Sequence, residues 1–117
     1  MYDKESLKKT ENGFSFTIKN SIANGNVVEV YLLALNDEEI PFSNITIENE
    51  SITVIADQIS PENPVELRKG VSTSFKVVKD NLTDLVNQEV KIHMKFKVQV
   101  RDSKMTIDFD FQDILKE

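Results

Sequence analysis

The chain contains no cysteine and no tryptophan, and its 117 residues include one histidine, three glycines and three prolines. The absence of cysteine excludes disulfides, thiolate nucleophiles and cysteine-ligated zinc or iron–sulfur centres. The single histidine, His93, excludes metal sites built from paired histidines. Three glycines are too few for a glycine-rich phosphate-binding loop. Much of the common metal and nucleophile chemistry is therefore excluded at the outset.

Long hydrophobic runs are also missing. The longest unbroken apolar stretch spans residues 30–35, whereas a membrane-spanning helix needs about 18 apolar residues or more. No transmembrane segment is expected, and residues 1–13 lack the apolar core of a signal peptide. The net charge of -6 and the pI of about 4.8 argue against nucleic acid as a partner.

The composition, with 39% hydrophobic and 29% charged residues, is that of an ordinary soluble globular domain. A chain of this length is expected to form one domain. Residues 1–12 are polar and show no periodicity, so we expect a flexible N-terminal lead-in or linker there. Residues 13–117 are expected to form the single domain.

Alternation of apolar and polar residues recurs through that domain and predicts strands with one buried and one exposed face. The predicted strands cover residues 14–18, 27–35, 45–47, 52–56, 65–67, 71–78, 90–101 and 105–111. The run 27–35 is almost continuously apolar, which is typical of a central strand covered on both faces. Residues 80–85 predict one short helical turn, with Asp80 as its N-cap.

These elements predict an all-β fold, an immunoglobulin-like antiparallel β-sandwich of seven or eight strands, with an all-β barrel as the alternative. Loops 36–44 and 57–64 are expected to carry contacts, because function in such folds usually lies on loops. Strand addition at an exposed sheet edge is a further route to a partner, although the sequence does not show which strand lies at the edge.

The sharpest local feature is a basic stripe on the polar face of the strand ending at Arg101. It consists of Lys91, His93, Lys95, Lys97 and Arg101, and a polyanion is one ligand that such a stripe can bind. A turn at residues 102–103 offers a structural alternative. The pairs expected from this turn are Val100 with Met105, Phe96 with Phe109, Lys97 with Asp108 and Lys95 with Asp110. Because both the apolar and the charged sets match in this register, we favour cross-strand charge pairs over a polyanion site.

Other candidate sites have simpler interpretations. The acidic cluster 37–39 offers oxygen ligands for calcium, but it lacks EF-hand spacing and is better interpreted as a solvated loop. Asp108 and Asp110 share one face, yet lysine partners would keep both carboxylates ionised, which opposes general-acid catalysis. His93 is expected to be a solvated strand residue. Asn-x-Ser/Thr triplets at Asn44, Asn49 and Asn81 would accept glycans only in a secreted eukaryotic protein. We therefore assign no catalytic, cofactor-binding or metal-binding residue.

Two segments resemble a known family. Val28–Asn36 running into Ile40-Pro41, and the later stretch Glu66–Val77, are similar to bacterial immunoglobulin-like (telokin-like) domains of secreted lipoproteins in Gram-positive bacteria. The stretch Leu67-Arg68-Lys69-Gly70 departs from the family pattern, because no proline precedes the glycine. The resemblance implies a surface-anchored or secreted module and carries over no catalytic residue.

The expected function is a non-catalytic interaction or spacer module of a bacterial cell-surface or exported protein, binding a protein or cell-wall polymer as a monomer. The expected location is therefore extracellular or at the cell surface, with the signal or anchor outside this sequence. An intracellular or phage structural subunit that forms an oligomer is the alternative. A small carbohydrate-active or metal-dependent enzyme is a third interpretation, which loss of activity on Asp108→Asn or His93→Ala would support.

Overall fold

The computed structural model describes residues 2–21 and 23–117, and within them it contains ten strands and three single 3-10 turns. The strands are β1 (Lys8–Lys9), β2 (Gly13–Lys19), β3 (Gly25–Leu35), β4 (Glu38–Glu39), β5 (Ile45–Glu48), β6 (Thr53–Ile55), β7 (Val65–Leu67), β8 (Ser72–Val78), β9 (Glu89–Val100) and β10 (Ser103–Ile114). The turns are η1 (Phe42–Asn44), η2 (Ala56–Gln58) and η3 (Thr83–Leu85).

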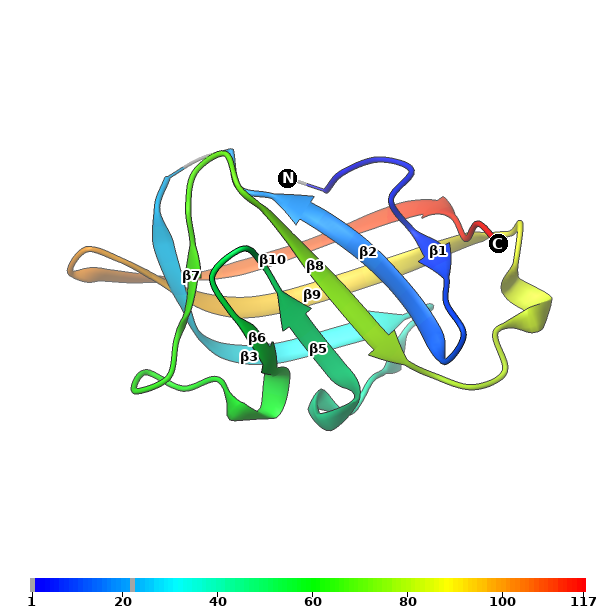
Figure 1. The fold of residues 1–117 in the computed structure, drawn as a ribbon, viewed down its shortest axis with the longest axis horizontal. Helices are drawn as coiled ribbons and strands as arrows, with labels where there is room; N and C mark the ends of the chain where they lie inside the picture. The colour runs from blue at the N-terminus through cyan, green and yellow to red at the C-terminus, as the bar shows by residue number, and fades with distance from the viewer. Residues whose placement is uncertain (1, 22) are drawn as a thin grey trace.

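The strands form two antiparallel sheets that pack face to face, so the expected all-β sandwich is confirmed (Figure 1). Sheet 1 has the order β1-β2-β8-β5-β6, and sheet 2 has the order β10-β9-β3-β4, with β7 also pairing with β3. The strand count exceeds the expected seven or eight because β1 and β4 have two residues each. Two residues are too few to show an alternating pattern.

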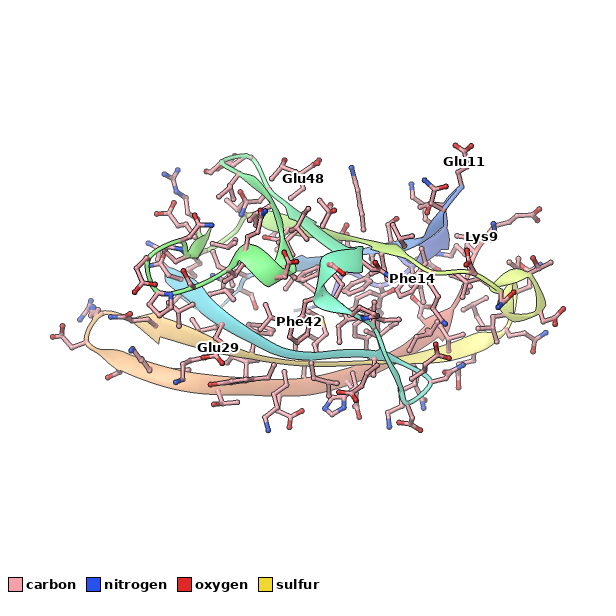
Figure 2. All side chains as sticks on the ribbon, turned by 90° about the horizontal axis from the view of Figure 1, so that it is seen from below. Lys9, Glu11, Phe14, Glu29, Phe42 and Glu48 are labelled. Carbon is pink, nitrogen blue, oxygen red and sulfur yellow. The ribbon has the colours of Figure 1, made fainter. Side chains whose placement is uncertain are left out.

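The core lies between the two sheets. Phe14, Phe16 and Ile92 are almost fully buried there, and the rings of Phe16 and Phe75 stack with centroids 5.0 Å apart. Figure 2 views the two layers edge-on, with Glu48 pointing away from the sandwich on the side of sheet 1. The inward set alternates along β2, β8 and β9 as the sequence predicts, because successive side chains of a strand point to opposite faces.

Strand β3 differs from the sequence expectation. Its middle is open on one face, since Glu29 and Tyr31 are exposed, whereas residues 27–28 and 33–35 are buried. Its pairing with β9 shifts between Val27 and Glu29 and again between Val30 and Leu32. Each shift is a bulge that re-aims the following side chains. The expected cover on both faces therefore holds near the ends of β3 and fails in its middle, where the register shifts lie.

The N-terminal segment also differs from the expected flexible lead-in, at least over residues 2–9. Leu7 is fully buried in the core, and Lys8 and Lys9 pair with β2. One buried leucine is enough to hold the segment against the core, and a single apolar residue produces no periodic pattern in the sequence. The boundary at residue 13 is therefore too late, while the single domain over the rest of the chain stays a prediction.

The expected helical turn is confirmed as η3, although its N-cap is Leu82 and no side chain caps it, so the assignment of Asp80 as N-cap is wrong. None of the described residues belongs to a helix long and apolar enough to cross a membrane.

Candidate binding surface on the β9–β10 hairpin

The hairpin of β9 and β10 is the longest regular element and extends beyond the end of sheet 1 (Figure 1). Its two-residue turn lies one residue earlier than the sequence suggested, at Arg101 and Asp102, because Ser103 already pairs with Val100 and Arg101 takes a left-handed backbone conformation, with φ of 56°. The register is thus shifted by two residues from the expected one. Phe109 lies opposite Met94, and Asp108 lies opposite Lys95.

The charge pairs on the outer face of this hairpin differ from the expected ones as a result. His93 Nε2 lies 2.6 Å from Asp108 Oδ1, and Lys91 Nζ lies 3.9 Å from Asp110 Oδ2. Within the described part of the chain, no ion pair within 4.0 Å involves Lys95 or Lys97. The expected pairs Lys97–Asp108 and Lys95–Asp110 are therefore wrong, and Asp108 contacts His93 while Asp110 lies beside Lys91 instead.

The free edge of β10 is unlike the other edges of the sandwich. Sheet 1 ends in β1 and β6, of two and three residues, and the far side of sheet 2 carries only β4 and β7, of two and three residues. Strand β10 has 12 residues, no proline and an unbroken register with β9. Proteins usually shorten, bend or cover such edges, because unpaired backbone groups recruit further strands.

The inner face of β10 carries an apolar row that sheet 1 only partly covers. We call these four residues, Met105, Ile107, Phe109 and Phe111, the β10 strip. Met105 is 46% exposed, and the other three are half-buried against the core. The Phe109 ring meets the Phe96 ring edge-on, with centroids 6.2 Å apart. The strip is thus anchored at one end and open toward the hairpin turn.

A small apolar pocket of about 120 Å³ lies between the sheets beside the open end of this strip. Met105 and Ile107 line it together with Phe96, Val98 and the backbone of Gly25. A Cβ at Gly25 would lie 2.9 Å from Cγ1 of Val98, so a larger residue there would displace the side chains that line the pocket. The pocket extends the apolar surface of the strip into the sandwich.

The N-terminal segment closes the other end of the strip. The Tyr2 ring stacks on Phe111 with centroids 3.7 Å apart, and its hydroxyl donates to Asp113 Oδ2 at 2.7 Å. The backbone N–H of Glu5 donates to the same oxygen at 2.9 Å. The described residues beyond Phe111 are therefore tied to the N-terminal segment, whereas residues 103–110 are not.

Tyr2 and Asp113 shift each other's titration in opposite directions. Burial, followed by the hydrogen bond to Asp113, raises the pKa of Tyr2 to about 12. Burial acts to raise the pKa of Asp113 as well, but the hydrogen bonds from Tyr2, Glu5 and Ile114 outweigh burial and hold that pKa below its usual value. The contact is thus a charge-assisted hydrogen bond that ties the two ends of the chain together.

The acidic segment 37–39 forms a tight hairpin turn rather than a loop. Asn36 and Asp37 both have positive φ, and Glu38 and Glu39 pair back onto β3 as β4. Lys91 Nζ lies 3.8 Å from Asp37, and Lys79 Nζ lies 2.5 Å from Glu38. Among the described residues, no group of three or more histidine, aspartate or glutamate side chains is arranged to hold a metal ion.

The two expected contact loops are more regular than the sequence suggested. Loop 36–44 contains β4 and η1, and loop 57–64 contains the end of η2 and a bridge between Ser60 and Asn63.

Among the asparagines of the Asn-x-Ser/Thr triplets, Asn49 accepts hydrogen bonds from the backbone N–H groups of Ser51 and Ile52 through its side-chain oxygen. Its side-chain amide donates to the carbonyl oxygen of Glu66. Asn49 is therefore a turn residue.

A polar groove of about 620 Å³ lies on the outer face of sheet 1. It is lined by small hydroxyl side chains, including Ser15, Thr17, Thr46 and Ser74, with Lys76 at its side. Thr17 and Ser74 bond to each other across β2 and β8 at 3.4 Å. The groove is open and its hydroxyls partly satisfy one another, so it offers less driving force for binding than the apolar strip.

Sequence reasoning missed the Tyr2–Asp113 contact and the burial of Leu7 and Leu115. One signal was available, since Leu7 is a lone apolar residue in a polar segment and Tyr2 is the single aromatic residue before Phe14. Neither residue shows periodicity, so the pattern alone does not place them. The unpaired edge of β10 was invisible because strand order is not encoded in local alternation.

The family comparison overturns the resemblance to secreted bacterial immunoglobulin-like lipoprotein domains. Residues 1–115 match the family described as hydroxymethylglutaryl-CoA reductase, N-terminal domain. No curated protein matches the chain. Because this family is a domain of an enzyme and is intracellular, the expected surface spacer function and the extracellular location are both wrong. The match leaves out only the last two residues, and the chain belongs to the hydroxymethylglutaryl-CoA reductase N-terminal domain family.

Proposed function

We propose that this chain is a non-catalytic domain of a hydroxymethylglutaryl-CoA reductase, and that it supplies a protein-contact surface rather than catalytic groups. The observation that carries the proposal is the β10 strip. It presents Met105 and three half-buried apolar side chains along a long, unpaired strand edge. Apolar side chains beside free backbone groups are the chemistry of strand and side-chain recognition between proteins.

The chemistry-bearing side chains of the hairpin support a structural role. Asp108 contacts His93, and Asp110 lies beside Lys91, on the outer face of a sheet rather than in a cleft. These residues are better suited to holding the two long strands together than to acting on a substrate.

Hydroxymethylglutaryl-CoA, the compound in the family's name, is the substrate with which the absence of catalysis is tested. We expect the purified chain neither to bind hydroxymethylglutaryl-CoA saturably in titration calorimetry nor to consume it. Saturable binding would contradict a purely protein-binding role, and turnover that Asp108→Asn or His93→Ala abolishes without loss of stability would establish an enzyme instead.

The contact surface is tested with two matched substitutions. Met105→Lys and Val78→Lys each place a charge at an exposed apolar side chain, 46% exposed on β10 and 51% exposed on sheet 1. We expect Met105→Lys to weaken association of the chain with itself or with the catalytic region of the reductase. Val78→Lys should leave it unchanged, and equal effects of the two would contradict a surface centred on β10.

A further inference from the structure

We infer that the partner of the β10 edge is a second copy of this chain, and that two β10 strands pair antiparallel about a twofold axis through Ile107. The inference rests on the proposed contact role and names the occupant of that surface. The pairing would join the two copies of sheet 2 into one continuous sheet.

The first argument is the length of the available edge. Residues 103–110 make no backbone hydrogen bond to any described segment other than β9, while the Tyr2 ring stacks on Phe111 and residues 2–5 hold Asp113. A twofold axis at Ile107 pairs Ser103 with Phe111 of the second copy. The paired stretch then spans the open part of the strand and stops where the N-terminal segment begins.

The second argument is that both faces match in this register. On the outer face, Lys104 would lie opposite Asp110 of the other copy, and twofold symmetry would form this oppositely charged pair twice. On the inner face, Met105 would lie opposite Phe109, and Ile107 opposite its own copy. Cross-strand pairs of opposite charge and of apolar with aromatic residues are the pairs that stabilise antiparallel sheets.

Neighbouring registers are opposed by charge. An axis through Phe109 would place Asp108 opposite Asp110 twice, and an axis through Asp108 would place that carboxylate opposite its own copy. An axis through Thr106 would pair Lys104 with Asp108 but would set Asp110 against Asp102 at the turn. Like charges directly opposite each other destabilise a pairing, so the Ile107 register is the favoured one.

The side chains that decide the register are available. Lys104 is exposed and makes no ion pair within 4.0 Å in the described residues. Asp110 is exposed, and its contact with Lys91 at 3.9 Å lies at the limit of an ion pair. Forming the intermolecular pair therefore requires little rearrangement within each copy.

A charge exchange tests the inference. Sedimentation equilibrium over a wide concentration range would give the dimer dissociation constant for the wild type, for Lys104→Glu, for Asp110→Lys and for the double variant. Each single change creates two like-charge pairs and should raise the dissociation constant about tenfold or more. The double variant recreates two opposite-charge pairs with reversed sign and should recover most of the wild-type affinity.

Matched controls are Lys19→Glu and Asp57→Lys, which make the same charge changes at exposed positions of sheet 1 and η2. Both should dimerise like the wild type, and thermal melting of every variant checks that it is folded. A monomeric wild type over the whole range would overturn the inference, as would a double variant no better than the single ones. Either outcome leaves the proposed function standing, because that proposal is decided by the hydroxymethylglutaryl-CoA titration and by association with the catalytic region of the reductase.

Discussion

Gly13 shows how tightly a single residue can be constrained by its neighbours. It begins β2 opposite Val78, and a Cβ built on it would lie 1.8 Å from the carbonyl oxygen of Val77. Its backbone has no positive φ, so the constraint is close approach rather than conformation. The backbone of β8 would have to move to accommodate any side chain here.

We therefore expect Gly13→Ala to destabilise the fold by about 2 kcal/mol or more, because the clash is with backbone rather than with a flexible side chain. Urea unfolding measures the change. Gly70→Ala is the useful comparison, because nothing lies within 4 Å of its Cβ position and its cost comes from a φ of 86° alone. A smaller loss for Gly13→Ala than for Gly70→Ala would contradict this view of β2.

The Tyr2–Asp113 contact should make stability depend on pH at both extremes. The lowered pKa of Asp113 contributes stability above the value of about 3.9 for an unfolded aspartate. That contribution is lost as the pH falls through the lower folded value. The pKa of Tyr2, raised to about 12, contributes stability below pH of about 10, which is lost as the pH rises toward 12.

Tyr2→Phe keeps the ring on Phe111 and removes the hydroxyl. We expect it to cost about 1 kcal/mol near neutral pH and to abolish the part of the alkaline loss that Tyr2 causes. Urea unfolding at a series of pH values compares the variant with the wild type. If the free energy of unfolding of Tyr2→Phe fell above pH of about 10 as much as that of the wild type, the ionisation of Tyr2 would not be the cause of the alkaline loss.

At the scale of elements, the sequence predicts which residues face inward much better than it predicts which residues lie opposite each other. The alternation along β9 gives its buried set correctly. The register with β10 was wrong by two residues, and a two-residue shift preserves the face of every side chain. Apolar and charged patterns thus fit both registers. Only the turn distinguishes them, and the tight turn places Arg101 where glycine or asparagine is usual.

Other element-scale differences have equally specific causes. The two bulges in β3 have no signature in an unbroken apolar run. Strands β1 and β4 have two residues each, which is too short to show alternation, and they are defined by their pairing with β2 and β3. The acidic turn 37–39 was recognised as polar, but its positive φ values and its lysine neighbours depend on tertiary packing.

The β9–β10 turn offers a test of the observed register. Arg101 has φ of 56°, a conformation that costs about 1 kcal/mol for a residue with a Cβ and almost nothing for glycine. We expect Arg101→Gly to stabilise the fold by up to about 1 kcal/mol, measured by urea unfolding. In the register first expected from the sequence, Arg101 would be an ordinary strand residue. In that register Arg101→Gly would destabilise the fold, so a loss of stability would contradict a turn at Arg101 and Asp102.

At the scale of the whole molecule, three of the sandwich's boundaries are finished by strands of two or three residues, and β10 is left as a long regular edge. Family membership alone does not predict this difference between the edges of the two sheets. A domain of a hydroxymethylglutaryl-CoA reductase can contribute chemistry, substrate contacts or assembly, and the open edge with its apolar strip favours assembly. From the sequence, a protein or cell-wall polymer partner that contacts loops or an exposed strand edge stays a prediction, and the family match contradicts the expected location at the cell surface.

The most direct test of the contact surface maps it without any substitution. Backbone amide NMR spectra of the isotope-labelled chain would be recorded from dilute to concentrated protein. We expect concentration-dependent shifts to gather on residues 103–111, with sheet 1 unchanged. Shifts centred instead on the groove of sheet 1, or spectra that are identical over the whole range, would contradict the assignment of β10 as the edge on which two copies meet.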